Sequence, residues 1–280
     1  MKNIRYGLLL LPLFACGGSD SADSPSPDAG AQNVADGGVS TDGGGPKNPD
    51  AAVLADSGLP AADGGFDSGP QSSQAPVALG AAAPFAILAF NTVTNVNNPG
   101  TIVTGNLGIS PGAALAGFPP GMVIGMVDAG DAAAAAAKAA LLMAYNDASG
   151  RLGAAVLAGD LSGLTFAPGL YKNSTSVMLS AGNLTLDALG DANAVFIFQM
   201  GSTLTTSPGT HVILSGGAKA TNVYWAVGTS ATLGTNSIFK GTILAASAIT
   251  MKTGAAIEGR LLAEAASVTL DTSVVTVPAP

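Results

Sequence analysis

Threonines recur through the C-terminal half of the chain, each directly before an apolar residue. The repeated pairs are Thr203-Leu204, Thr232-Leu233, Thr250-Met251 and Thr269-Leu270. Neighbouring residues of a strand point to opposite sides, so an inward Leu or Met places the preceding threonine outward. Strands stacked about 4.8 Å apart would turn these threonines into a ladder of hydroxyl and methyl groups. Such a ladder can form a binding surface, although threonine is also favoured in strands for structural reasons alone.

Small residues flank this ladder. One column combines Gly201, Ser230, Ala248 and Ser267, and a second set of threonines, Thr206, Thr235, Thr253 and Thr272, follows the apolar positions by two residues. The outward position after the apolar residue is uneven: Thr205, Gly234, Lys252 and Asp271. A second face, around 236–238 and 254–256, is expected to be less polar and equally free of charge. Which of the two faces binds a ligand stays open, and the candidate contacts come from both: Thr203, Ser230, Thr232, Thr235, Ala248, Thr250, Thr253, Ala255, Ser267 and Thr269.

Residues for covalent, acid–base or metal chemistry are sparse. His211 is the single histidine and Cys16 the single cysteine, which leaves no His/Cys metal cluster and no Cys–His pair. The nearest acidic pair of the domain, Asp187 and Asp191, is better explained as turn residues than as a catalytic dyad. We expect no enzyme activity, no metal and no cofactor.

The element that positions the threonines is a repeat. Residues 228–263 divide into two blocks of 18, GTSATLGTNSIFKGTILA and ASAITMKTGAAIEGRLLA, and a partial third copy follows at an offset of 19. A repeat of this length fits three short strands and three turns. The chain is therefore predicted to be mostly β, a triangular β-helix (solenoid) of roughly 18-residue coils.

One long alanine-rich helix is predicted from Asp128 to about Ser149, with Asp131 as its cap or in its first turn. Leu141, Leu142 and Tyr145 form its apolar stripe. Continuous apolar runs suit strands covered on both sides, so the helix should pack on the face built from residues 195–198, 223–227, 242–245 and 260–263. Residues 110–120, rich in Gly and Pro, are predicted to form an excursion loop or cap.

Composition separates the folded domain from what precedes it. Only 10% of the 280 residues are charged, and the net charge of −8 sits mostly before Ala75. No basic patch is present for nucleic acid.

Residues 1–16 resemble a lipoprotein signal peptide with Cys16 as the lipidated residue, and an ordinary cleaved signal is the alternative. Residues 17–75 are predicted to be a disordered linker and 76–280 the domain. The expected product is a monomeric secreted lipoprotein, at the outer membrane or cell surface, that contacts membrane only through this anchor.

Several segments resemble the bacterial and fungal ice-binding proteins with a discontinuous β-solenoid and a long α-helix, the group of domain of unknown function 3494. They run in family order: 79–80 with 84–89, 104–111, 144–151, 164–172, 195–199 and 214–218. The resemblance implies adsorption to ice through one flat solenoid face, without a cofactor. Members often carry Thr-Ala/Gly-x-Thr/Asn on that face. Here Thr253-Gly254-Ala255-Ala256 keeps the first half of the motif, and Thr235-Asn236-Ser237-Ile238 departs further.

The hypothesis is thus a surface-displayed ice-binding protein that inhibits ice growth and recrystallisation. The alternative is a non-enzymatic adhesion or structural solenoid. A polysaccharide-active β-helix enzyme is the third option, and it would require clustered carboxylates in a groove.

Overall fold

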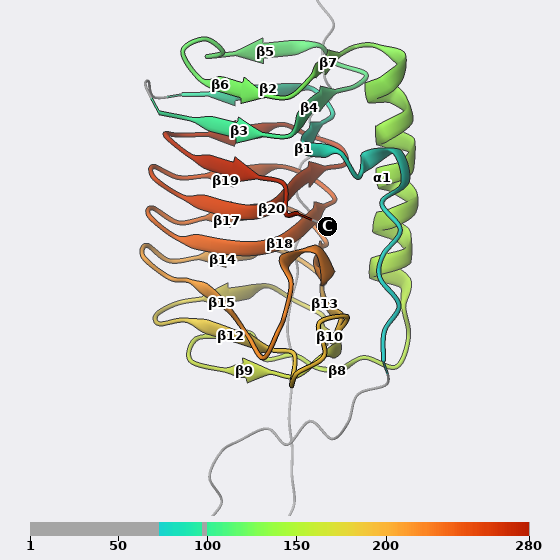
Figure 1. Ribbon diagram of the computed structural model, residues 1–280, viewed down its shortest axis with the longest axis vertical. Helices are drawn as coiled ribbons and strands as arrows, with labels where there is room; N and C mark the ends of the chain where they lie inside the picture. The colour runs from blue at the N-terminus through green and yellow to red at the C-terminus, as the bar shows by residue number, and fades with distance from the viewer. Residues whose placement is uncertain (1–72, 97–99, 280) are drawn as a thin grey trace, which may run out of the picture. The chain divides into compact units, whose positions relative to one another are not determined.

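The computed structural model describes residues 73–96 and 100–279, and the predicted signal peptide, lipidated Cys16 and most of the predicted linker lie outside these residues. The described chain is a stack of β-coils with one α-helix along its side (Figure 1). All strand pairings within it are parallel, as stacked solenoid coils require. Within these ranges no helix is long and apolar enough to span a bilayer.

Each coil contributes strands to three faces. We call the first the seven-stranded face, in the order β11 (Val177–Leu179), β14 (Leu204–Thr206), β17 (Ala231–Leu233), β19 (Ile249–Met251), β21 (Val268–Leu270), β2 (Thr92–Asn95) and β5 (Ala114–Ala116).

The helix-covered face contains β8 (Ala155–Val156), β10 (Gly169–Asn173), β13 (Phe196–Met200), β16 (Val223–Val227), the second halves of β18 (Ile238–Ala245) and β20 (Ala256–Ala263), then β1 (Phe85–Ala89), β4 (Asn106–Ile109) and β7 (Val127–Ala129). The third face contains β9 (Thr165–Phe166), β12 (Leu184–Asp187), β15 (Val212–Ser215), the first halves of β18 and β20, then β22 (Val274–Thr276), β3 (Ile102–Thr104) and β6 (Met122–Ile124). Two 3-10 turns, η1 (Gly80–Ala82) and η2 (Ala220–Asn222), complete the elements.

Two glycines form the corner at which β18 and β20 pass from the third face to the helix-covered face. Gly241 has φ +103°, which a side chain would strain, and Gly259 is its register partner in the next coil. A Cβ on Gly259 would lie 1.8 Å from the carbonyl oxygen of Gly241. Glycine is therefore required here for the coils to stack at strand spacing.

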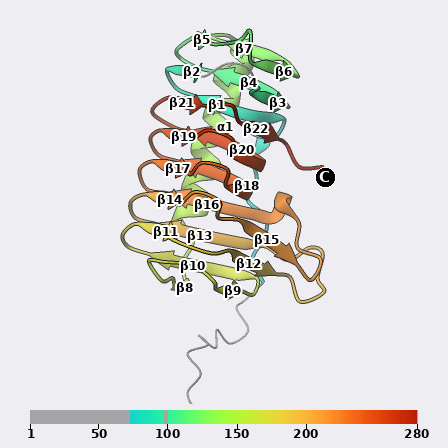
Figure 2. The same cartoon turned by 90° about the vertical axis from the view of Figure 1, so that its left-hand side faces the viewer.

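The solenoid is discontinuous in sequence. Strands β1, β2 and β3 from the beginning of the domain pair with β20, β21 and β22 from its end. The N-terminal coils therefore continue the stack above the last C-terminal coil, and the helix returns the chain to the opposite end (Figures 1 and 2). The predicted loop or cap at 110–120 is partly wrong, because it contains β5, the outermost strand of the seven-stranded face.

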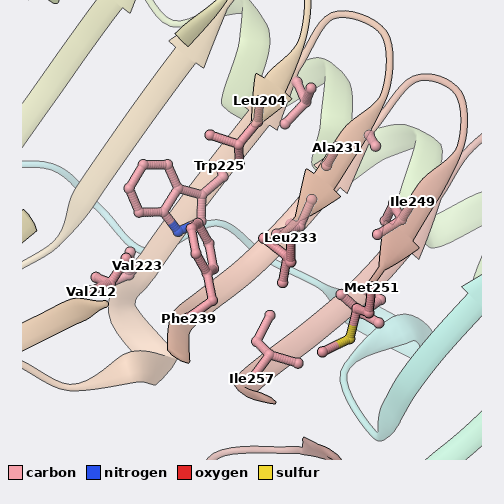
Figure 3. Close-up of a cluster of buried hydrophobic side chains, with 14 of the residues drawn as sticks. Leu204, Val212, Val223, Trp225, Ala231, Leu233, Phe239, Ile249, Met251 and Ile257 are labelled. Carbon is pink, nitrogen blue, oxygen red and sulfur yellow. The ribbon is translucent and has the colours of Figure 1, made fainter. Parts of the chain in front are cut away.

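The coil interior contains a stack of aromatic rings. Tyr171, Phe198 and Trp225 are register partners in successive coils, with ring centroids 5.4 Å and 4.3 Å apart and nearly parallel planes. Phe239 continues the series 4.9 Å from Trp225 (Figure 3). The Trp225 indole donates a hydrogen bond to the Lys240 carbonyl. Toward the other end of the stack the same register positions become aliphatic, with Ile243 and Leu261. The row of Leu204, Ala231 and Ile249 in Figure 3 lines the inner side of the seven-stranded face.

The helix α1 spans Ala132–Gly150, four residues shorter at its start than predicted, because Asp128 belongs to β7. The Asp131 side chain caps it by accepting a hydrogen bond from the Ala134 amide. Leu142 was wrongly placed in the apolar stripe and is 46% exposed. Five alanines fill most of the buried face instead and allow close packing on the sheet: Ala134, Ala137, Ala140, Ala144 and Ala148. Lys138 and Leu141 are the other buried residues of the helix.

Polar contacts fix the position of this helix. Lys138, its one buried cation, donates through Nζ to the carbonyls of Ala263 (2.7 Å) and Glu264 (2.6 Å) and pairs with the Glu264 carboxylate at 3.3 Å. Burial lowers the pKa of Lys138, and Glu264 opposes that shift. At the C-terminus, the Gln199 amide donates to the carbonyls of Ala148 and Arg151. Polar contacts in the first half and at the C-terminus thus hold the helix against the face that the sequence predicted.

Replacing Phe198 with Ala should lower the free energy of unfolding by about 3–5 kcal/mol, because it removes the middle ring of the stack and leaves a cavity. Chemical denaturation of the wild type and the variant measures this difference. Leu152→Ala is the control: Leu152 is 91% exposed, and its truncation should change stability by less than about 0.5 kcal/mol. An equal effect of both substitutions would contradict this account of the core.

Candidate functional site

The seven-stranded face is one of the two long faces that the helix leaves uncovered. Its strands β5, β2, β21, β19, β17, β14 and β11 succeed one another along one side of the stack (Figure 2). Most of these strands have three residues, of which the first and third point into the core and the middle one points outward. The face is therefore defined by single outward side chains that repeat once per coil.

Five successive strands of this face each carry a threonine at the outward position. The register pairs Thr205 with Thr232, Thr232 with Thr250, Thr250 with Thr269 and Thr269 with Thr94. We call this set the threonine column. Met178 lies next to Thr205 at one end and Ala116 next to Thr94 at the other. At a strand spacing of about 4.8 Å, the column presents a hydroxyl and a methyl group at each step.

A second outward column begins each strand, two residues before the threonine column. We call it the leading column, and it is mixed in composition: Ser176, Thr203, Ser230, Ala248, Ser267 and Thr92. Two hydrogen bonds connect hydroxyls of neighbouring strands within it. Thr203 donates to Ser176 at 2.9 Å, and Thr92 donates to Ser267 at 2.8 Å. The latter bond crosses the junction between the N-terminal and C-terminal coils.

The structure corrects the alignment of the first repeat. Leu204 pairs with Ala231, not with Leu233, and Thr205 rather than Thr203 pairs with Thr232. Thr206 is buried, and its hydroxyl accepts a hydrogen bond from the Gly234 amide at 2.8 Å. From Leu204 to Ala231 the chain advances 27 residues, compared with 18 from Ala231 to Ile249. The longer coil contains β15 and η2, so an 18-residue period could not align it.

Other predicted contacts lie away from the two columns. Ala255 is wholly buried in the core and cannot touch an external ligand. Thr235 and Thr253 lie in the turns between the seven-stranded face and the third face, and the Thr253 hydroxyl donates to the Asp271 carboxylate at 2.6 Å. The remaining predicted residues are on the face, while Thr94, Thr205 and Thr92 were missed. The Thr-Val-Thr pattern of residues 92–94 is the sequence signal for two of these.

The third face is not free of charge, contrary to expectation. Lys240 and Glu258 form an ion pair of 2.7 Å between neighbouring strands. Beside them a hollow of ≈ 640 Å³ opens between β15 and β18, lined in part by Lys219. Partly exposed apolar side chains cover the rest of the face: Ile102, Met122, Ile124, Ile238 and Val274. This face is therefore less regular than the seven-stranded face.

The nearest acidic pair of the domain and its single histidine lie apart from the two columns. The carboxylates of Asp187 and Asp191 accept hydrogen bonds from the amides of Leu189 and Asn193, so both are turn residues as predicted. Between 73 and 96 and from 100 to 279 no group of three or more His, Cys, Asp and Glu residues could hold a metal ion. His211 forms an isolated bridge with Ile238 at the edge of the third face.

Asp160 ends the row of outward residues beyond Met178, with which it forms an isolated parallel bridge. The Ser162 hydroxyl donates to its carboxylate at 2.6 Å, and the Ser180 hydroxyl donates to the other oxygen. These two hydrogen bonds lower the pKa of Asp160 to about 2. The charged Asp160 carboxylate, already hydrogen-bonded by two serines, therefore lies at this end of the seven-stranded face. Charged groups are a common protection of sheet edges.

Comparison with known proteins gives a consistent match. Residues 87–276 match the family described as ice-binding-like. An ice-binding protein from Nostoc sp. (strain HG1) is 45% identical over 70% of this chain and 72% of its own length. Ice-binding protein 1 of Shewanella frigidimarina is 36% identical, but the match spans only 26% of that longer protein. The crystal structure of an ice-binding protein from an Antarctic biological consortium has 46% identity and a TM-score of 0.73, covering 75% of this chain and 95% of that one.

The stabilisation provided by Asp160 should depend on pH. Its folded-state pKa of about 2 lies below the unfolded value of about 3.9, so the stabilisation is complete above pH ~4 and is lost as the pH falls toward ~2. We expect the difference in unfolding free energy between the wild type and Asp160→Asn to narrow over that window. Denaturation at several pH values measures it, and a difference that stays constant would contradict the assignment.

Proposed function

Because the chain belongs to the ice-binding-like family, we propose that it binds ice, and that it does so through the seven-stranded face. The observation that carries this proposal is the threonine column, five outward threonines in unbroken register on a face that no helix covers. The regular strand spacing matches the need of a crystalline ligand for contacts at fixed intervals.

The mechanism follows from the groups on that face. Each threonine offers a hydroxyl that bonds to water and a methyl group that water surrounds without bonding. Repeated at a fixed rise, the two groups favour one arrangement of the water layer, which then joins the crystal lattice. Each contact is weak, and the column adds them along one rigid surface. Adsorbed molecules pin the growing crystal front, which inhibits growth and recrystallisation.

The seven-stranded face is preferred over the third face on electrostatic and geometric grounds. The Lys240–Glu258 pair holds its own strongly bound water, which would compete with an ice-like layer. The neighbouring hollow interrupts the surface. On the seven-stranded face, by contrast, the charged residues Lys252, Asp271 and Asp160 lie at the edge or the end, outside the threonine column.

We further propose that the protein has no enzyme activity, acts as a monomer and is displayed at the outer membrane or cell surface through lipidated Cys16. Support for the anchor comes from the sequence alone, from Lys2 and Arg5 followed by an apolar run that ends at Cys16. A flexible linker over residues 17–75 would let the domain turn its binding face toward ice.

Replacing Thr250 with Tyr should abolish the shaping of ice crystals and the inhibition of recrystallisation, because a bulky ring in the middle of the column prevents flat contact. Ice-crystal microscopy and a recrystallisation assay measure both effects. The matched control is Thr276→Tyr, which places the same change at an outward, partly exposed threonine on β22 of the third face. The control should keep full activity.

If instead Thr276→Tyr alone abolished activity, the third face would be the binding face. If the folded wild type neither shaped ice nor slowed recrystallisation, ice binding would be wrong for this protein. Attachment to cells, glycans or a partner protein would then support the alternative of an adhesion or structural solenoid.

The anchor is tested by Cys16→Ser in the full chain. This substitution removes the only thiol available for lipidation, so the protein should move from the membrane fraction to the soluble secreted fraction on cell fractionation. An unchanged distribution would argue for an ordinary cleaved signal.

A further inference from the structure

The two outward columns of the seven-stranded face differ in how their hydroxyl groups are used. In the leading column, Thr203 and Thr92 donate to the serines of the adjacent strands. In the threonine column no hydroxyl has a hydrogen-bond partner within the part of the chain that the structure describes. Each hydroxyl of the threonine column is therefore free to donate to and accept from water.

The columns also differ in regularity. Threonine is β-branched, so its χ1 angle is restricted in a strand. Five identical residues in register, each between two buried neighbours, therefore present their methyl and hydroxyl groups alike from coil to coil. The leading column varies among Ser, Thr and Ala along the stack and does not present the same side chain in every coil.

We propose that the threonine column alone recognises the ice lattice, and that the leading column is a structural seam that keeps neighbouring coils in register. This inference rests on the proposed function and assigns unequal roles within the same face. The seam matters most between Thr92 on β2 and Ser267 before β21, since this bond joins segments 175 positions apart. There it aligns Thr94 with Thr269 and so extends the column across the chain discontinuity.

Two double variants separate these roles with the same chemical change on the same strands. Thr94→Val with Thr205→Val removes hydroxyls from the two ends of the threonine column, on β2 and β14. Thr92→Val with Thr203→Val removes hydroxyls from the leading column, on β2 and immediately before β14. Valine keeps the branched shape and the strand preference in every case.

We expect the Thr94/Thr205 variant to keep the wild-type melting temperature. Its concentration for half-maximal recrystallisation inhibition should rise about thirtyfold, the factor that two lost hydrogen bonds of about 1 kcal/mol each represent. We expect the Thr92/Thr203 variant to melt at a lower temperature while its half-maximal concentration at low temperature stays that of the wild type.

The reverse pattern, with activity lost from a folded Thr92/Thr203 variant and kept by the Thr94/Thr205 variant, would overturn the inference. Equal activity of both variants would also overturn it, because hydroxyl groups would then not distinguish the columns. If Thr250→Tyr still abolished activity in either case, the proposed binding face would stand and only the division of roles would fail. If Thr250→Tyr had no effect, the proposed face itself would fail.

Discussion

Parallel, in-register stacking of the coils is the constraint on which the rest of the structure depends. Backbone hydrogen bonds between successive coils set the strand spacing, and every side chain then repeats at that spacing. The aromatic stack inside, the glycine corner at Gly241 and Gly259 and the threonine column outside all result from this repeat. A ligand with its own lattice is the kind of partner that such a surface suits, because strength comes from repetition rather than from any single contact.

The helix decides which surfaces remain available. It covers one face with alanines and is fixed to that face by the hydrogen bonds of Lys138 and Gln199. Of the two remaining faces, one carries the Lys240–Glu258 pair and a hollow, and the other carries small uncharged side chains. The few charged residues lie at edges, in turns, beside the helix and on the third face, and the threonine column contains none of them.

The regular part of the fold could be predicted from the sequence because its signal is local. The repeat over 228–263 predicted the coils, and the continuous apolar runs identified the helix-covered face. The register of Leu204 could not be predicted from an 18-residue period, since its coil is 27 residues long. The place of Thr94 in the threonine column could not be predicted either, because it depends on pairing with Thr269 from the other end of the domain. Ala255 was misassigned because a turn can direct a small residue inward, and only packing reveals it.

The insertion of the first strands above the last coil has a consequence for how the protein is made. Strands β1 to β3 leave the ribosome early, but their partners β20 to β22 are the last to be synthesised. Their pairing closes a loop of most of the domain, which is a slow kind of contact to form. Until β20 pairs with β1, that edge of β1 has no neighbouring strand, and its apolar residues are not covered there. The complete array should therefore arise in one late, cooperative step, and a chain interrupted before its final coil would lose the strands that join the N-terminal coils to the rest of the stack.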